Sequence, residues 1–292
     1  MAGSSVTGPT SCLRSDHRGG RTGVSAPPGN VGPVNPDLQL ALRLADAADV
    51  ITLDRFRAAD LRVTRKPDRT PVTDADTAAE DALRALIAAE RPDDVVLGEE
   101  RGGAVSASDR GWVLDPIDGT KNFSRGMPIW ATLVGLTVHG IPVVGVASAP
   151  AMGRRWWAGA GQGAWTSDLG GGAPRRIAVS GVCELADAYL STTDLRTFAH
   201  QGRLDHYLQL VEACWETRAF GDFWQHCLVA EGVLDVAVDA AANPWDLAAL
   251  VPIVTEAGGR LTDLSGADTF AGGNGLSTNG TLHQAVLAHV RT

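Results

Sequence analysis

The chain has 292 residues, enough to bury a full core as one large domain or two lobes. Hydrophobic residues make up 44% and charged residues 20%, which is ordinary for a folded soluble protein. The formal net charge of −9 argues against an extended surface for nucleic acid or anionic membranes.

The first predicted elements follow a tail of low apolar content. Residues 1–36 are rich in Gly, Ser, Thr, Pro and Arg, and we expect a disordered N-terminal extension there. Apolar side chains then recur at helical spacing over residues 38–58, which predicts a helix. The sequence TDAD at residues 73–76 has the form of a capping box and opens a second predicted helix, which Pro92 ends. Asp76 therefore lies in the first turn of that helix.

Two short apolar runs predict strands that deliver acidic side chains. Residues 95–97 form the first run, which ends next to Glu99 and Glu100. Residues 111–114 form the second run, which leads into the sequence DPIDGT at residues 115–120. We expect Glu100 to be a solvated carboxylate, whereas Glu99 and the DPIDGT sequence are candidates for chemistry.

The DPIDGT sequence combines two carboxylates with a turn. Asp115 and Asp118 lie three residues apart, and carboxylate oxygens are ligands that suit Mg²⁺. The backbone N–H groups of Gly119 and Thr120 can cradle a phosphate if a helix begins there. By itself the sequence is equally compatible with a plain turn, because Asp, Pro and Gly are common turn residues. Both interpretations stay open at this point.

The remainder of the chain divides into two parts by its predicted elements. Strands dominate to about residue 180, after which strands and helices alternate. Asn243 is a predicted helix cap with Pro244 in the first position, which places Asp246 in the first turn. We expect an α+β lobe over residues 37–180 that holds most of the acidic candidates, and an α/β lobe over residues 181–292 that holds Asp246.

Four acidic blocks occur in order along the chain, at residues 66–76, 98–100, 115–120 and 243–246. In order and rough spacing they resemble the inositol-monophosphatase-like family of Mg²⁺-dependent phosphatases, and the resemblance covers residues 37–292. The family implies an α/β (α+β) fold, a layered α/β/α/β/α sandwich of the inositol-monophosphatase and fructose-bisphosphatase type. It also implies a homodimer that acts on a small phosphorylated metabolite.

The resemblance implies two to three Mg²⁺ ions in each active site. Six residues are expected to hold them directly or through water: Glu99, Asp115, Ile117 through its backbone carbonyl, Asp118, Asp246 and Asp76. Ions of this kind activate water and stabilise the leaving oxygen of a phosphate ester. Because the sequence has no GxSxG or P-loop motif, we expect direct attack by metal-activated water rather than a covalent intermediate.

The resemblance also implies roles in catalysis and in phosphate binding. Glu99, Thr120 and Asp76 are the expected catalytic residues, and Thr120 is expected to help orient the attacking water. Asp118, Gly119 and Thr120 are expected to bind the phosphate.

Substrate identity depends on the C-terminal half of the chain, where residues 218–232 resemble actinobacterial histidinol-phosphate phosphatases. Four residues are expected to contact the substrate: Asp222, Trp224, Asp239 and Arg218. A carboxylate and an aromatic wall suit a cationic, imidazole-bearing alcohol better than a neutral polyol. The alternative for Trp224 is a plain core position at a helix start.

The predicted function is therefore hydrolysis of L-histidinol phosphate in histidine biosynthesis, by a phosphoric monoester hydrolase. An inositol-1-monophosphatase or a broad sugar-phosphate phosphatase is the alternative. A non-catalytic regulatory protein on this scaffold is a remote alternative, because clustered acids without a cation repel each other and cost stability.

Lysine and cysteine usage adds two expectations. The chain has only two lysines, Lys66 and Lys121, and both fall among the acidic blocks. This indicates either an ammonium group that arginine does not replace or a chance placement. The four cysteines are scattered without a C-x-x-C pair, which is typical of free thiols. With no apolar segment of membrane-spanning length, we expect a cytoplasmic protein without a membrane partner.

Overall fold

The structure is a computed structural model that describes residues 35–67, 70–107 and 109–291. Of the expected disordered extension over residues 1–36, residues 1–34 lie outside the described residues. Pro36 already belongs to the first helix, which the Asn35 side chain caps by accepting the backbone N–H of Asp37 over 2.9 Å. Among the described helices, none is both long and apolar enough to cross a bilayer.

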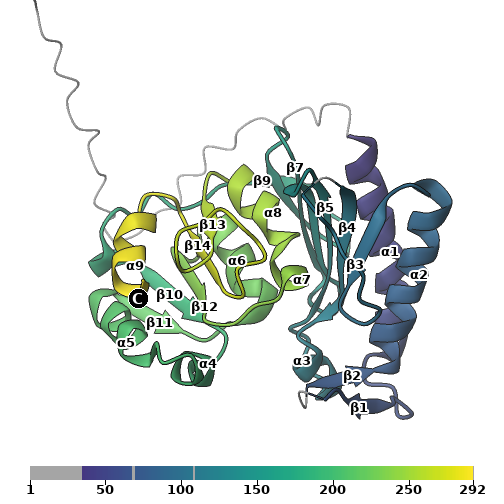
Figure 1. Ribbon diagram of the computed structural model, residues 1–292, viewed down its shortest axis with the longest axis horizontal. Helices are drawn as coiled ribbons and strands as arrows, with labels where there is room; N and C mark the ends of the chain where they lie inside the picture. Colours follow the sequence, from purple (N-terminus) through teal and green to yellow (C-terminus); the bar gives the residue numbers. More distant parts are fainter. Residues whose placement is uncertain (1–34, 68–69, 108, 292) are drawn as a thin grey trace, which may run out of the picture.

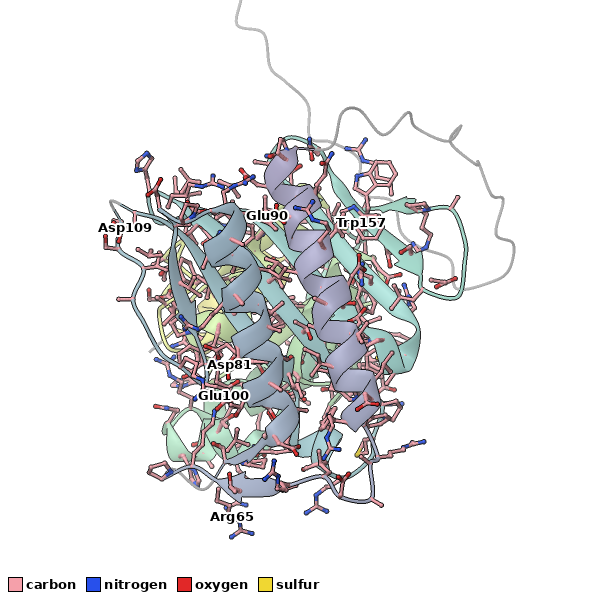
Figure 2. The ribbon with its side chains drawn as sticks, turned by 90° about the vertical axis from the view of Figure 1, so that its right-hand side faces the viewer. Arg65, Asp81, Glu90, Glu100, Asp109 and Trp157 are labelled. Atoms are coloured by element: carbon pink, nitrogen blue, oxygen red, sulfur yellow. The ribbon has the colours of Figure 1, made fainter. Side chains whose placement is uncertain are left out.

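Two sheets and three layers of helices stack as α/β/α/β/α in the described part of the chain (Figure 1). One outer layer contains α1 (Pro36–Arg55) and α2 (Asp74–Glu90), which Figure 2 shows side by side. The middle layer contains α6 (Asp222–Ala230), α7 (Pro244–Leu247) and α8 (Leu250–Glu256). The other outer layer contains α4 (Leu195–His200), α5 (Leu204–Ala213) and α9 (His283–Val290). The layered sandwich expected from the resemblance is confirmed.

The large sheet has the order β3-β4-β5-β6-β7-β8-β9, with β3 parallel to β4 and the other neighbours antiparallel. Its strands are β3 (Val95–Gly98), β4 (Arg110–Asp118), β5 (Ala131–Val138), β6 (Ile141–Ala149), β7 (Arg154–Gly159), β8 (Ala164–Asp168) and β9 (Arg175–Ile177). Its central strands are buried along most of their length, because helices cover both faces.

The small sheet has the order β11-β10-β12-β14-β13, in which β10 runs parallel to both of its neighbours. Its strands are β10 (Tyr189–Thr192), β11 (Glu216–Arg218), β12 (Val236–Asp239), β13 (Arg260–Thr262) and β14 (Gly275–Thr278). A separate hairpin consists of β1 (Val63–Arg65) and β2 (Pro71–Thr73). The predicted lobe boundaries, 37–180 and 181–292, stay a prediction.

The cysteines depart from the sequence-based expectation at one position. Cys214 and Cys227 carry free thiols, as expected. Cys183 is disulfide-bonded, so the expectation of a free thiol is wrong there.

Strand β4 carries the DPIDGT sequence to the end of the large sheet. Its register against β5 shifts between Asp115 and Asp118. An irregularity of this kind bends a strand and changes the direction of its side chains. Gly119 follows with a φ of 86° and begins the short helix α3 (Thr120–Ser124), a turn that favours glycine. The bend and the turn together place both carboxylates at one end of the sheet.

Two glycines bring the middle helices directly onto the large sheet. Gly135 of β5 pairs with Gly145 of β6. A Cβ atom at Gly145 would lie 1.9 Å from the carbonyl oxygen of Ala249, and one at Gly135 would lie 3.0 Å from the Ala249 nitrogen. Ala249 stands at the start of α8, immediately after the helix that carries Asp246. The close approach therefore sets the position of Asp246.

Replacing Gly145 by alanine should lower the free energy of unfolding by about 1–3 kcal/mol, because the new methyl group overlaps backbone atoms of Ala249. Urea denaturation measures this change. Gly181→Ala is the matched control, since a Cβ atom there meets nothing within 4 Å. Equal midpoints for wild type and Gly145→Ala would show that α8 moves away from the sheet without cost.

Candidate active site

A cleft of about 400 Å³ opens at the end of β4, between the DPIDGT segment and the N-termini of α6 and α7. Six acidic residues line it: Glu99, Asp115, Asp118, Asp194, Asp222 and Asp246. Among the described residues of its wall, Lys121 is the one cationic side chain. A wall with this charge is costly unless it receives a cation.

Three carboxylates converge in this cleft. Asp115, Asp118 and Asp246 each offer one oxygen, and these oxygens lie within 4.8 Å of one another. Each carboxylate also accepts a backbone N–H, over 3.0, 2.6 and 2.7 Å respectively, from Ile117, Phe223 and Asn243. Carboxylates from two separate elements that are fixed this closely form a donor set suited to a divalent cation.

The electrostatics of the three acids support the same conclusion. Burial, followed by repulsion from Glu99 and Asp118, raises the pKa of Asp115 well above its usual value. Burial, followed by repulsion from Asp222 and Asp246, raises the pKa of Asp118 in the same direction. Burial is also the main cause that raises the pKa of Asp246 to about 7. A divalent cation would offset this repulsion, so the residues present fit a metal.

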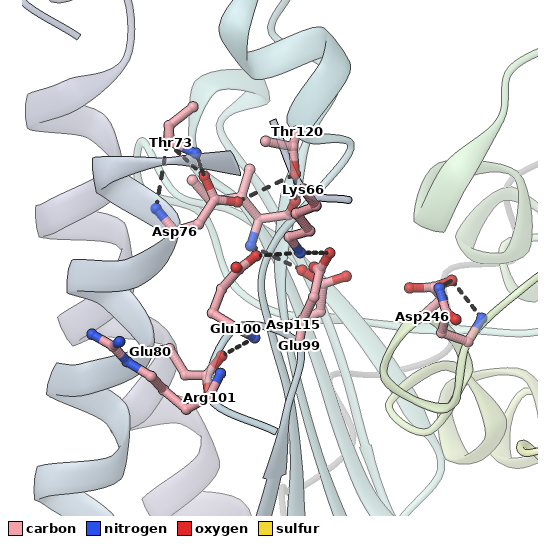
Figure 3. Close-up of polar contacts among 12 residues, drawn as sticks. Lys66, Thr73, Asp76, Glu80, Glu99, Glu100, Arg101, Asp115, Thr120 and Asp246 are labelled. Atoms are coloured by element: carbon pink, nitrogen blue, oxygen red, sulfur yellow. Dashed lines mark hydrogen bonds and ion pairs between the residues drawn. The ribbon is translucent and has the colours of Figure 1, made fainter. Parts of the chain in front are cut away.

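Glu99 and Glu100 follow β3 and share one ammonium group (Figure 3). Lys66 Nζ donates to Glu99 Oε1 over 2.6 Å and to Glu100 Oε1 over 2.8 Å. Burial opposes the charge on Lys66, but the hydrogen bonds and the two negative charges outweigh it and raise the pKa of the lysine. The side chain of Glu100 is only 7% exposed, so the expectation of a solvated carboxylate is wrong. Of the pair, Glu99 lines the cleft.

Asp76 lies behind the cleft wall, and Thr120 stands between the two (Figure 3). Asp76 Oδ2 accepts the backbone N–H of Thr73 over 2.8 Å and its hydroxyl over 2.5 Å, so the predicted capping box is present. Thr120 Oγ1 lies 3.2 Å from Asp76 Oδ1 and 3.0 Å from the Ile117 carbonyl oxygen. Burial raises the pKa of Asp76 to about 7 against the hydrogen bonds from Thr73.

Of the four predicted substrate-contacting residues, Asp222 lines the cleft. It begins α6 with a φ of 48°, and its backbone N–H donates to Thr193 Oγ1 over 2.8 Å. Its carboxylate accepts Asn122 Nδ2 over 3.2 Å. Burial and then repulsion from Asp239 raise its pKa to about 6, while the charge of Lys121 opposes the rise.

Trp224 and Arg218 lie outside the set of residues that line the cleft. Trp224 packs against Phe220 with ring centroids 5.4 Å apart, and its indole N–H is buried without a hydrogen-bond partner. The Arg218 side chain is 54% exposed and donates to the Glu216 carboxylate over 2.7 Å.

Asp239 lies behind Asp222 and is not among the residues that line the cleft. Its Oδ2 accepts Gln225 Nε2 over 2.7 Å and lies 2.9 Å from His226 Nε2. Its Oδ1 accepts the backbone N–H of Thr193 over 3.3 Å. Through Thr193 the buried carboxylate supports the start of α6, where Asp222 meets the cleft.

The cleft wall also contains residues that the sequence did not single out as substrate contacts: Thr70, Lys121, Asn122, Met127, Thr193, Asp194 and Phe220. Lys121 carried a signal, because it is one of only two lysines and follows the DPIDGT sequence directly. Thr193 and Asp194 carried no such signal in the sequence. They line the cleft because β10 ends next to it, at Thr192.

Comparison with known proteins shows to which family this chain belongs. The model of the "inositol monophosphatase family" matches residues 35–292. The chain belongs to this family. A histidinol-phosphatase from Mycobacterium tuberculosis is 51% identical over 254 residues, which cover 87% of this chain and 97% of that protein. A histidinol-phosphatase from Streptomyces coelicolor is 48% identical over 258 residues, covering 87% and 96%.

The structural comparison agrees. The solved structure of an inositol monophosphatase from Zymomonas mobilis superposes with a TM-score of 0.75 at 33% identity, covering 88% of this chain and 98% of that one. Membership of the inositol monophosphatase family confirms the resemblance carried by the four acidic blocks.

Replacing Asp115 by asparagine should show that this side chain is needed for metal binding but not for folding. We expect turnover at saturating Mg²⁺ to fall more than about 100-fold, beyond the usual loss for a residue that only supports a ligand. Without metal, the melting temperature should equal or exceed that of wild type, because one buried charge is removed from a repelling group. We expect Mg²⁺ to raise the melting temperature of the wild type but not that of the variant. Near-normal turnover would contradict a metal-binding role for Asp115.

Proposed function

We propose that the protein is a Mg²⁺-dependent histidinol-phosphatase, which hydrolyses L-histidinol phosphate to histidinol and inorganic phosphate in histidine biosynthesis. The observation that carries the proposal is the convergence of Asp115, Asp118 and Asp246 in a cleft whose wall also holds Asp222. Such an acidic group fits divalent cations and, together with them, a phosphate dianion. Identities of 51% and 48% to two histidinol-phosphatases support the substrate.

The proposal includes two to three Mg²⁺ ions. Carboxylate oxygens would come from the three converging acids and from Glu99, with the Ile117 carbonyl as a further oxygen donor and Asp76 acting through water. When bound, such ions neutralise the substrate phosphate and make water a nucleophile at neutral pH. The proposed reaction uses no covalent intermediate on the protein.

Thr120 is proposed to orient the attacking water. Its hydroxyl proton points inward, toward Asp76 Oδ1 or the Ile117 carbonyl oxygen, so its lone pairs are free to accept a hydrogen bond from the cleft. A water molecule that donates to Thr120 keeps a lone pair for the phosphorus. Gly119 and Asp118 lie beside Thr120 in the wall, and we assign phosphate binding to the three together.

Asp222 is proposed to pair with the cationic part of the substrate. Histidinol carries an ammonium group and an imidazole ring, which a carboxylate and the Phe220 ring in the same wall can recognise. A neutral polyol offers no cation to Asp222. Asp239 then acts on the substrate indirectly, by holding Thr193 next to the start of α6. Trp224 and Arg218 act on the substrate site from outside the cleft wall.

An inositol-1-monophosphatase or a broad sugar-phosphate phosphatase is the second candidate, favoured by the structural match to an inositol monophosphatase.

We also propose that the protein is a cytoplasmic homodimer. Sedimentation equilibrium can measure the mass of the assembly.

A panel of three substrates tests the function. Phosphate release should give a kcat/KM for histidinol phosphate about 100-fold above those for inositol-1-phosphate and glycerol-2-phosphate, because a site built for a polar group rejects analogues that lack it. EDTA should abolish the activity and Mg²⁺ should restore it. A preference for inositol-1-phosphate would favour the second candidate, and activity that survives EDTA would contradict both.

Replacing Asp222 by asparagine tests the basis of specificity, because it removes a charge but little volume. For histidinol phosphate we expect a loss of about 2–4 kcal/mol in kcat/KM, a factor of roughly 30 to 1,000. Hydrolysis of glycerol-2-phosphate should be almost unchanged. Asp205→Asn, an exposed acid on α5, is the control. Equal losses on both substrates would mean that Asp222 supports the fold or the metals instead.

A further inference from the structure

Glu80 is a fully buried carboxylate that none of the acidic blocks contains. It lies on α2 and accepts three hydrogen bonds: from the backbone N–H of Glu100 over 2.7 Å, from that of Arg101 over 3.1 Å, and from Arg84 Nε over 2.7 Å. A buried carboxylate is stable only with partners of this kind. Two of its three partners belong to the turn that follows β3 (Figure 3).

That turn carries both acidic side chains of the second block. Glu99 projects into the cleft wall, and Glu100 holds Lys66. Because one carboxylate binds two successive backbone N–H groups, it fixes the position of the turn as well as its distance from α2. Gly98 makes the contact possible, since a Cβ atom there would lie 2.1 Å from Glu80 Oε1.

The same face of α2 also contacts the DPIDGT segment. Asp76 precedes Glu80 by one helical turn, and residues four apart are neighbours on a helix surface. Asp76 Oδ1 lies 3.2 Å from Thr120 Oγ1 (Figure 3). Helix α2 is thus bound at one point to the turn with Glu99 and, one turn earlier, to the segment with Asp115. It sets the spacing of two acidic segments that approach the cleft from parallel neighbouring strands.

We propose that Glu80 is a positioning residue, which raises the metal affinity of the cleft by holding the turn with Glu99 in its binding position. The proposal rests on the proposed function only in that the cleft binds divalent cations and that Glu99 is one of their ligands. Without Glu80 the turn gains freedom that metal binding must remove, and this ordering cost weakens binding. Once metal is bound, the ligand returns to the same place, so the chemistry itself should change little.

Titration of Glu80→Gln with Mn²⁺ alone, followed by electron paramagnetic resonance, tests this without substrate. The glutamine oxygen can accept one of the two backbone N–H groups, but its NH₂ group can accept neither. We expect Mn²⁺ to bind about 10- to 100-fold more weakly than in wild type, the usual effect of losing a residue that orients a ligand. In turnover, the half-saturating Mg²⁺ concentration should rise by the same factor, while kcat at saturating Mg²⁺ stays within about threefold.

Asp81→Asn is the matched control. Asp81 is the next residue of α2, and it binds the same turn through the Arg101 side chain, over 2.8 and 2.6 Å, rather than through the backbone. Its side chain is 54% exposed, on the outer side of α2 that faces the viewer in Figure 2. We expect its Mn²⁺ affinity to stay within about twofold of wild type, because an exposed ion pair contributes little.

Gly98→Ala is a second variant, which displaces the Glu80 carboxylate without changing its charge and should weaken Mn²⁺ binding like Glu80→Gln. If Glu80→Gln does not fold, Gly98→Ala and Glu80→Asp decide the question. Wild-type Mn²⁺ affinity in a folded variant, even one with a lowered melting temperature, would overturn the proposal, as would an equal loss in Asp81→Asn. A wild-type protein inactive on histidinol phosphate would refute the proposed function but leave these binding results interpretable.

Discussion

Repulsion between buried carboxylates is the constraint on which the rest of this structure depends. Oxygens of Asp115, Asp118 and Asp246 lie within 4.8 Å of one another, and each uncompensated buried charge costs several kcal/mol by the usual magnitude. The protein offsets part of this cost with one backbone N–H for each carboxylate and with the ammonium group of Lys66 on the neighbouring Glu99. The repulsion that is left opposes folding without metal and favours binding with it. The same interaction therefore sets both the stability and the metal affinity of the cleft.

The acidic group forms only when the large sheet and the middle helices are assembled. Asp118 ends β4 in the large sheet, but its carboxylate is held by the backbone N–H of Phe223 on α6. Asp246 is carried by α7, whose position follows from the contact of α8 with Gly135 and Gly145. Opening of either part would separate the proposed ligands, so metal binding should be coupled to the global stability of the protein rather than to one loop.

The residues themselves predicted the local features of the site. The convergence of Asp246 with Asp115 and Asp118 was expected only from the family resemblance, and other long-range contacts were missed. The capping box at residues 73–76 and the DPIDGT sequence were readable because their interacting groups are adjacent in the chain. The layered fold came from family resemblance, since periodicity alone does not order strands in a sheet. Glu80 could not be recognised, because its backbone partners lie 20 and 21 residues further on, and a buried glutamate on a helix has the same local pattern as an exposed one. The placement of Asp239 and Arg218 likewise depends on strand positions in the small sheet, which local patterns do not specify.

At the start of α6, the support of a proposed metal ligand and the proposed substrate contact belong to two adjacent residues, Phe223 and Asp222. The backbone N–H of Phe223 holds Asp118, and any residue except proline supplies that donor. The side chain of Asp222 forms part of the cleft wall, so its charge can change while the support of Asp118 stays the same. The backbone limits the choice, because a φ of 48° is tolerated by Gly, Asn and Asp but strains branched side chains. Asn or Gly in place of Asp222 would therefore remove this one charge from the cleft wall without strain. A branched residue would instead disturb the turn that holds the proposed metal ligand, Asp118.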